Sequence, residues 1–160
     1  MTEGRIEKKI IQEKENIILG DFIIPMGTTK EDIKQRERLI WEMYGHWAAE
    51  TPDKKCYNNN LKSDIYVTFE SISETSNKAA RLYISTMAFW DLDFVLKNAY
   101  KVDENAPRSK RQQKFYKILI MEAKTSFFLP YFNLIKMTVG VTKIGRNNMY
   151  CITAIQPIIT

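Results

Sequence analysis

Residues 134–155 read LIKMTVGVTKIGRNNMYCITAI, with runs of alternating apolar and polar residues on either side of a turn. The turn, residues 144–147, contains glycine and asparagine, which tolerate turn backbones. The alternation predicts strands near 132–143 and 149–155 that pair as an antiparallel hairpin. The chain is therefore expected to end in an antiparallel sheet.

The register of this hairpin follows from its apolar residues. Pairing of Lys143 with Asn148 places Val139 opposite Ile152 on one buried face. A slip by one residue would move the apolar set out of the core, so the pattern favours this register. The other face then carries small and polar residues: Lys136, Thr138, Gly140, Thr142, Cys151 and Thr153.

The polar face of the hairpin is the first candidate site. Thr138 is expected directly opposite Thr153, and Gly140 would allow a ligand to approach the backbone closely. The alternative is a solvated outer face, on which threonines are ordinary strand formers. The residues alone leave both interpretations open.

Elements expected upstream complete the fold class. Residues 115–122 alternate like the hairpin and predict a third strand, and a strand is expected over 65–69. Helical spacing of apolar residues predicts helices over 28–50, 71–84 and 86–99. Helices followed by an antiparallel sheet of three or more strands indicate an α+β fold, with N-terminal helices packed on a C-terminal antiparallel sheet.

A length of 160 residues predicts a single domain over 1–160. Residues 1–60 are expected to form a helical N-terminal extension, in which 5–19 could be a helix that runs into a short strand. Residues 52–64 are expected to be a polar loop, and 61–156 the α+β core.

Composition bounds the class of protein. The chain is 44% hydrophobic and 12% aromatic, which is typical of a globular protein, and its net charge of +5 favours an acidic partner such as RNA or DNA. A charged N-terminus and the absence of a long apolar run argue against a signal peptide and a membrane span, so a cytoplasmic location is expected. Two distant cysteines and one histidine predict reduced thiols and no metal or other cofactor.

A basic connection precedes the third strand. Residues 108–117 contain five basic side chains and no acidic one: Arg108, Lys110, Arg111, Lys114 and Lys117. Such a segment is expected to contact a polyanion, because each phosphate that it neutralises releases counterions.

The stretch SISETSNKAA, residues 71–80, has the Ser71/Glu74 spacing of a capping box. A helix N-terminus also attracts phosphate, but a carboxylate at Glu74 already occupies its positive end. The stretch is therefore interpreted as a helix start, with Lys78 and Arg81, one turn further on, as the candidate phosphate contacts.

Two further sets of residues are candidates of lower weight. His46 lies on the first long helix beside a tryptophan, where a packing or capping role is more common than general-base catalysis. Aromatic residues around Pro130 can stack on bases, form a protein-binding surface or be buried: Phe127, Phe128, Tyr131 and Phe132.

The order of elements resembles a known group over about residues 61–156. A strand and a capped helix lead to the helix AFWDLDFVLKNAYKVD, the basic connection, and the strands QKFYKILIMEAK, LIKMTVGVT and MYCITAI. This arrangement is similar to the phage and mobile-element branch of the barnase–EndoU–colicin–RelE-like nuclease superfamily. It is also similar to accessory domains of polyvalent proteins that such elements carry.

The resemblance implies metal-independent cleavage of RNA by side chains on the exposed sheet face. Because no histidine follows His46, it implies a histidine-free scheme. Lys136 would be the base, Arg81 with Lys78 would hold the phosphate, and two hydroxyls would donate to it. The implied catalytic set is Lys136, Arg81, Thr138 and Thr153, and the implied substrate-binding set is Lys78, Arg108, Lys110, Arg111 and Lys114.

The competing function is a non-enzymatic module. In that case the same basic surface binds a nucleic acid or a protein, as an inhibitor or accessory protein of a mobile element does, without catalysis. A purely structural domain is the third class that the sequence permits.

Overall fold

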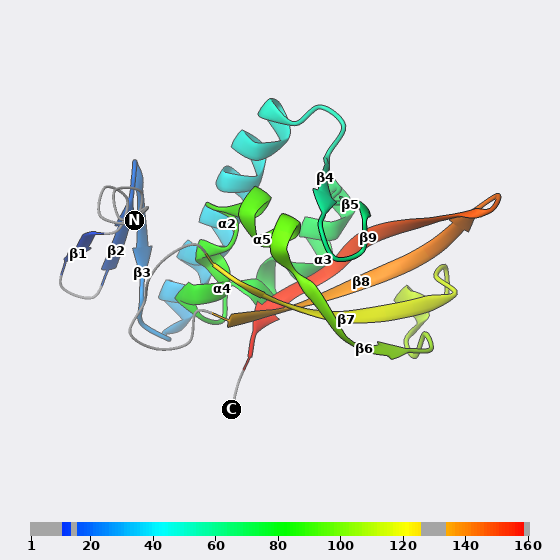
Figure 1. Ribbon diagram of the computed structural model, residues 1–160. Helices are drawn as coiled ribbons and strands as arrows, with labels where there is room; N and C mark the ends of the chain where they lie inside the picture. Colours follow the sequence, from blue (N-terminus) through cyan, green and yellow to red (C-terminus); the bar gives the residue numbers. More distant parts are fainter. Residues whose placement is uncertain (1–10, 14–15, 126–133, 159–160) are drawn as a thin grey trace.

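The computed structural model describes residues 11–13, 16–125 and 134–158. Figure 1 shows a small sheet at the N-terminal side, a layer of helices, and a long twisted sheet against those helices. The elements are β1 (Ile11–Glu13), β2 (Asn16–Leu19), β3 (Phe22–Pro25), α2 (Lys30–Glu50), β4 (Lys55–Asn58), β5 (Ser63–Tyr66), α3 (Phe69–Ala79), α4 (Tyr83–Met87), α5 (Leu92–Asn98), β6 (Tyr100–Asn105), the short 3-10 helix η1 (Lys110–Gln112), β7 (Lys117–Lys124), β8 (Leu134–Ile144) and β9 (Asn147–Pro157).

The α+β class is confirmed, but the expected arrangement is wrong in two respects. The large sheet has the order β4-β5-β9-β8-β7-β6 and is mixed, because β5 pairs parallel with β9. The helices are not all N-terminal, since α3, α4 and α5 lie between β5 and β6 in the chain. Parallel strands cannot be joined by a tight hairpin, so the chain between β5 and β9 makes a long crossover.

The N-terminal segment forms strands where a helix was expected. Ile17 pairs with Ile24 in the β2–β3 hairpin, and Gly20 makes its turn at a φ of +59°. Along β2 the buried residues alternate with half-buried ones, which is the period of a strand. The short strand expected at the end of 5–19 is present as β2, whereas the helix expected before it is wrong for residues 11–13, which form β1.

The first long helix is confirmed as α2. It begins at the N-cap Thr29, whose hydroxyl accepts a hydrogen bond of 3.1 Å from the backbone of Asp32, and it ends at Thr51. The N-cap therefore lies one residue after the predicted helix start at residue 28.

The polar loop expected over 52–64 contains β4, which the prediction missed. The sequence of β4, KCYN, lacks an apolar alternation, and its partner β5 was expected two residues too late. The buried Asn58 explains how so polar a strand is accommodated: its side chain donates to the carbonyls of Leu96 and Ala99 at 2.7 and 2.9 Å. These bonds attach β4 to the end of α5.

Helix α3 begins with a capping box, as expected, but at an earlier residue. Thr68 is the N-cap, and its hydroxyl accepts from the Ser71 backbone at 3.2 Å while the Ser71 hydroxyl accepts from the Thr68 backbone at 3.1 Å. Ser71 is thus the third residue of the helix, and Glu74 lies beyond the box. The helix stops at Ala79 rather than near residue 84.

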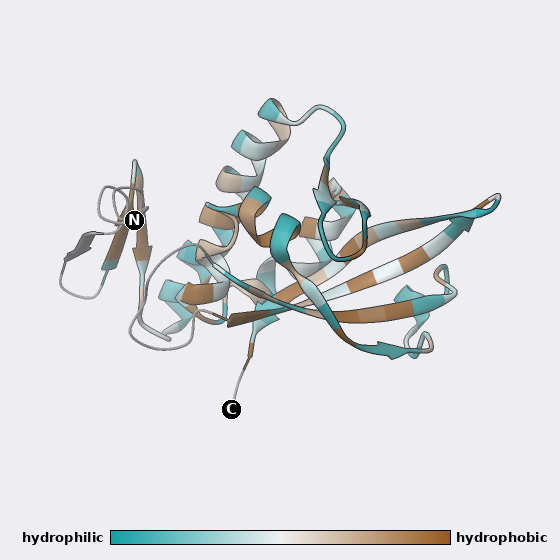
Figure 2. Cartoon of the chain, in the orientation of Figure 1, coloured by the Kyte–Doolittle hydropathy of each residue, from teal (hydrophilic) through white to brown (hydrophobic). Residues whose placement is uncertain are grey.

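The β8–β9 hairpin confirms the predicted register in its turn-proximal half. Lys143 pairs with Asn148, and Val139 pairs with Ile152, both of the latter being buried. Figure 2 shows the alternation of hydropathy along β8.

A β-bulge changes the register in the other half of the hairpin. Thr138 pairs with Ala154, so Thr153 is the extra residue and does not lie directly opposite Thr138. The Thr153 hydroxyl donates to the Thr138 carbonyl at 3.2 Å. The bulge moves the buried Ile155, rather than Ala154, into register with the buried Met137, which places the larger side chain in the core.

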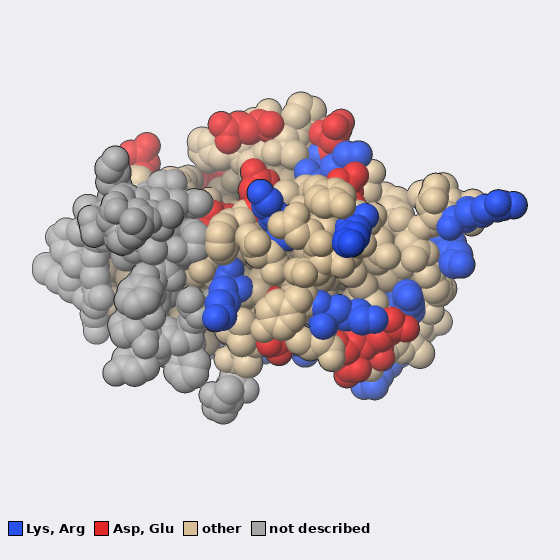
Figure 3. Space-filling model, in the orientation of Figure 1, with Lys and Arg blue, Asp and Glu red and all other residues tan. Residues whose placement is uncertain are grey.

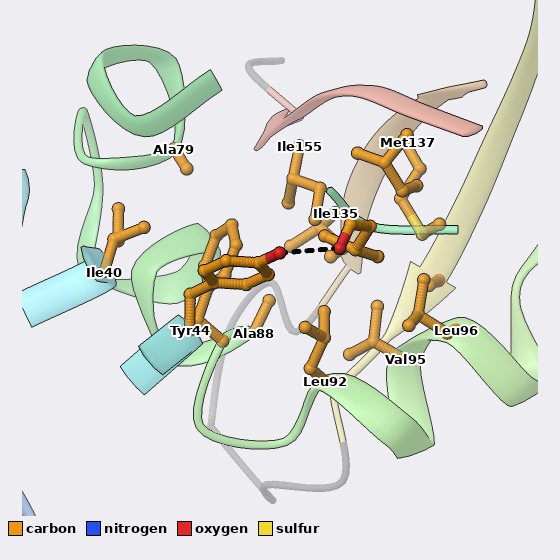
Figure 4. Packing of buried hydrophobic residues seen from close by; sticks show 14 of the residues in the cluster. Ile40, Tyr44, Ala79, Ala88, Leu92, Val95, Leu96, Ile135, Met137 and Ile155 are labelled. Carbon is orange, nitrogen blue, oxygen red and sulfur yellow. Dashed lines mark hydrogen bonds between the residues drawn. The ribbon is translucent and has the colours of Figure 1, made fainter. Parts of the chain in front are cut away.

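One buried cluster joins α2, α4 and α5 to the inner face of the large sheet (Figure 4). Within it, the Tyr44 hydroxyl donates to the Val67 carbonyl at 2.8 Å, and burial raises the pKa of Tyr44. The buried Thr75 hydroxyl on α3 accepts from the Ile155 amide at 2.6 Å and donates to the Ile155 carbonyl at 2.9 Å.

A second buried connection is made by Arg36 on α2, which is 0% exposed. Its guanidinium donates to four backbone carbonyls at 2.6–3.0 Å: those of Pro25, Gly27, Ala80 and Arg81. Burial lowers the pKa of Arg36, although Asp32 opposes this effect. Arg36 thereby attaches the segment after β3 to the end of α3.

Within the described residues, no helix is both long and apolar enough to cross a bilayer.

Candidate functional site

The segment between β6 and β7 crosses the outer face of the large sheet. The ring of Phe115 lies on Gly140, where an added Cβ would come within 2.5 Å of the ring, and the Tyr116 amide donates to the Val141 carbonyl at 3.0 Å. Gly140 does permit a close approach, as predicted, but the group that approaches is Phe115 rather than a ligand. The polar face is consequently partly covered, and Thr138 is only 9% exposed.

This crossing carries the basic segment to α3. Lys114 forms an ion pair with Glu70 in the first turn of α3, and Glu70 raises the pKa of Lys114. The short helix η1 belongs to the same segment between β6 and β7. A hollow of about 90 Å³ lies where η1, α3, β8 and β9 meet, and we call it the basic hollow; its lining includes Lys78, Arg111, Gln112, Thr138, Thr153 and Gln156.

The basic hollow unites four of the predicted site residues from distant parts of the chain. Lys78 comes from α3 and Arg111 from η1, while Thr138 and Thr153 come from the two strands of the hairpin. Glu74 on α3 also lines it and offsets one positive charge. Lys78, Arg111 and Gln112 can donate to the oxygens of a phosphate group, whereas the Thr153 hydroxyl already donates to the Thr138 carbonyl.

The other predicted residues lie elsewhere. Lys136 lines an adjoining hollow together with Asp103 and Glu122, and its partner on β9, Gln156, lines both hollows. Arg81 is exposed after the end of α3, and its carbonyl is bound by Arg36. Of the residues proposed as catalytic, Thr138 and Thr153 therefore line the basic hollow, whereas Lys136 and Arg81 do not.

Most charges near the basic hollow are unpaired. Among the residues that the structure describes, no ion pair involves Lys78, Arg108, Lys110 or Arg111, and the last three are exposed. Lys117 differs, because it lies 3.6 Å from Glu104. The surface available to a polyanion is thus Lys78 with the basic stretch 108–111.

A second, larger hollow lies away from these residues, between the last half of α2, the β2–β3 turn and the connection from α4 to α5. It has a volume of about 610 Å³ and contains His46, which is exposed and meets the Phe22 ring edge-on at 5.8 Å. Sequence reasoning did not find this hollow. One signal was available: Glu42, His46 and Glu50 recur at four-residue steps and so share one face of α2.

Two further predictions concern the aromatic residues around Pro130 and the binding of metal ions. The aromatic candidates Phe127, Phe128, Tyr131 and Phe132 lie outside the described residues. Among the residues that are described, no group of three or more His, Cys, Asp or Glu side chains could hold a metal ion. Both cysteines are free thiols.

Comparison of the chain with family models, with curated proteins and with solved structures finds no match. The resemblance to the nuclease superfamily therefore stays a prediction.

Proposed function

We propose that the protein is a non-enzymatic module that binds the phosphate backbone of RNA through the basic hollow and the adjoining basic stretch. The observation that carries this proposal is the meeting of Lys78 and Arg111, 33 positions apart in the sequence, at one hollow that also contains hydroxyl and amide donors. Arg108 and Lys110 extend the unpaired positive charge along the same segment.

The size of the hollow supports recognition of backbone rather than of a base. A volume of about 90 Å³ suits a phosphate-sized group, whereas a nucleobase requires a larger cavity or an exposed ring on which to stack. Binding of this kind is expected to depend strongly on salt and weakly on sequence.

Cleavage of RNA is the second candidate, and one observation favours it: Thr138 and Thr153 line the same hollow as Lys78 and Arg111. Cleavage also needs a base within hydrogen-bond reach of the attacking hydroxyl. Lys136, the residue proposed for that role, does not line the basic hollow but the adjoining one, where the carboxylate-bearing Glu122 is its strand partner. Binding without cleavage is thus the better supported function.

Fluorescence anisotropy with a labelled single-stranded RNA, repeated over a series of salt concentrations, tests the proposal. Changing Arg108, Lys110 and Arg111 to alanine should weaken binding and reduce the salt slope by about 0.7 for each phosphate that is no longer neutralised. The matched control removes three exposed, unpaired lysines elsewhere, Lys30, Lys34 and Lys97, and should change binding much less. Equal effects of both triple variants, or no binding by the parent at low salt, would refute the proposal.

Incubation of the same RNA with a high concentration of protein in EDTA tests the second candidate. We expect the RNA to remain intact. Products with a 2′,3′-cyclic phosphate, formed from RNA but not from DNA, would instead establish cleavage. In that event Lys136→Ala and Arg81→Ala should each lower the rate by about a hundredfold or more, and His46→Ala should leave it nearly unchanged.

A further inference from the structure

The hollow of about 610 Å³ is bounded by three elements that are distant in the sequence. One wall is the β2–β3 turn with Gly20 and Asp21, another is the last half of α2, and the third is the connection from α4 to α5. Arg36 fixes the relation of the first two walls, because it binds the carbonyls of Pro25 and Gly27. Contacts of the buried Arg36 thus support the hollow from the core of the fold.

Aromatic rings form the interior of this hollow. The Phe22 ring stands edge-on to Trp90, with ring centroids 5.7 Å apart, and to His46, at 5.8 Å. Trp90 is held in place by Gly20, since a Cβ added at that glycine would come within 2.9 Å of the indole. Trp47, on α2, adds a further ring to the lining. Faces of aromatic rings attract cations, most strongly when the ring is tryptophan.

Carboxylates surround the rings, and none of the described residues that line the hollow is a lysine or an arginine. The acidic residues are Asp21, Glu42, Glu50, Asp91 and Asp93. Among the described residues Asp21, Glu42 and Glu50 take part in no ion pair, whereas Asp93 accepts a hydrogen bond of 2.8 Å from the Trp47 indole. Figure 3 shows acidic side chains at the top of the molecule over α2, while basic ones extend farthest at the β8–β9 turn. A site of this sign in a chain of net charge +5 is suited to a positively charged ligand.

The spacing of the carboxylates distinguishes an organic cation from a metal ion. No three of the described acidic, histidine or cysteine side chains come close enough together to ligate one ion. Their charges are instead distributed around the hollow, with aromatic surface between them. A ligand that matches this pattern has several separated positive charges and apolar segments between those charges.

We propose that this hollow binds an organic polycation of the polyamine class, in which ammonium groups are separated by methylene chains. The ammonium groups would pair with the carboxylates of α2 and of the β2–β3 turn, and the methylenes would lie against Phe22 and Trp47. This site shares no residue with the basic hollow and is independent of the RNA-binding proposal.

Isothermal titration calorimetry of the full chain with spermidine, in the absence of RNA, tests the site. We expect saturable binding of one spermidine per chain, weaker binding of butylamine, which has one charge, and no comparable binding of Mg²⁺. Tryptophan fluorescence should change in the same titration, because Trp47 and Trp90 line the hollow whereas Trp41 packs against Phe69 outside it.

A pair of charge-matched variants locates the site. Glu42→Gln with Glu50→Gln should weaken spermidine binding about tenfold, because two ion pairs are removed while exposed side chains of the same shape remain. Glu31→Gln with Glu37→Gln removes the same charge from the same helix outside the hollow and should leave the affinity unchanged. Both variants are expected to fold, which far-ultraviolet circular dichroism verifies.

Three outcomes would overturn the proposal. Equal loss of affinity in both double variants would show general screening of the net charge. Equal affinity for spermidine and Mg²⁺ would show unspecific counterion binding. Binding that leaves tryptophan fluorescence unchanged would place the polycation elsewhere. Since none of these measurements involves RNA, failure here and failure of the RNA-binding proposal are separately observable.

Discussion

The two hollows of this protein differ in charge, size and construction. The basic hollow is small, of about 90 Å³, and its positive charge is carried by long side chains of α3 and of the segment before β7. The acidic hollow, that of about 610 Å³ beside α2, is walled by aromatic rings held against one another and against Gly20. The first therefore suits an extended chain of phosphates that contacts many flexible cations, and the second suits one compact ligand.

Both hollows depend on the buried side chain of Arg36. Arg36 binds the carbonyls of Pro25 and Gly27, which follow the β2–β3 wall of the acidic hollow. It also binds the carbonyls of Ala80 and Arg81, at the end of the helix that carries Lys78. A positive charge at a helix C-terminus is favourable, so this arrangement stabilises α3 as well as connecting the two regions.

Loss of Arg36 should have the largest effect on both regions. Arg36→Ala leaves four carbonyls without their donor and opens a cavity in the core, and we expect a loss of about 3–5 kcal/mol in the free energy of unfolding. Arg36→Lys should recover only part of this, because an ammonium cannot reproduce the planar fork of a guanidinium. Urea unfolding followed by circular dichroism measures the difference.

The control for Arg36 lies on the same helix. Arg38 is exposed and bonds only to the side chain of Gln35, so Arg38→Ala should change stability by no more than about 0.5 kcal/mol. An Arg36→Ala variant as stable as the Arg38→Ala variant would show that the four hydrogen bonds do not connect the two regions.

The sequence predicted the region of the basic hollow better than that of the acidic one, and the reason is physical. The β8–β9 hairpin has a strict period of two and one buried face, which specify the register near its turn. The bulge at Thr153 was not predictable from alternation, because its advantage is the burial of Ile155 against helices that are remote in the sequence. Alternation alone therefore gave the correct strands and an incorrect Thr138–Thr153 pair.

The acidic hollow could not be predicted in this way. Its walls come from three segments, and tertiary contacts such as those of Arg36 determine how these segments lie relative to one another. In addition, the short isoleucine-rich stretch that forms β2 fits a helix and a strand almost equally well. The basic stretch 108–111 was recognised from composition, whereas its path over the sheet depends on the contact of Phe115 with Gly140. Local pattern thus specified the elements, and contacts distant in sequence specified where their functional side chains meet.

The second prediction separates the two regions by disturbing only the basic hollow. Gly140→Ala places a methyl group within 2.5 Å of the Phe115 ring, so the segment that carries Arg111 must shift. We expect a loss of about 1–3 kcal/mol in the free energy of unfolding and weaker RNA binding, with spermidine binding unchanged. Urea unfolding and the two binding assays measure these effects.

A glycine with free space around it provides the control for Gly140→Ala. An added Cβ at Gly45, which is exposed on α2, meets no atom within 4 Å. Gly45→Ala should therefore stabilise the protein by up to about 1 kcal/mol through helix propensity. Equal loss of RNA and spermidine binding in the Gly140→Ala variant would mean that the two hollows are not separable.

The smallest expected effect concerns Cys56, whose Sγ lies 3.6 Å from the Asp93 carbonyl beside the acidic hollow. Burial, and then the charge of Asp93, raise the pKa of the Cys56 thiol from its ordinary value of 9.0 to about 11. The folded state therefore holds the proton more tightly than the unfolded state. The corresponding contribution to stability is complete below pH 9 and is lost as the pH rises toward 11.

Urea unfolding between pH 8 and pH 11 measures this contribution of Cys56. The decline in stability should be shallower in Cys56→Ala than in the parent, whereas Cys151→Ala, which keeps Cys56, should retain the parent slope. Asp93→Asn removes the neighbouring charge and should move the decline to lower pH, because the thiolate then meets less repulsion. If Asp93→Asn leaves the pH of the decline as it is in the parent, the charge of Asp93 does not raise the pKa of the Cys56 thiol. The difference in electrostatic potential between the two hollows is then confined to their surfaces.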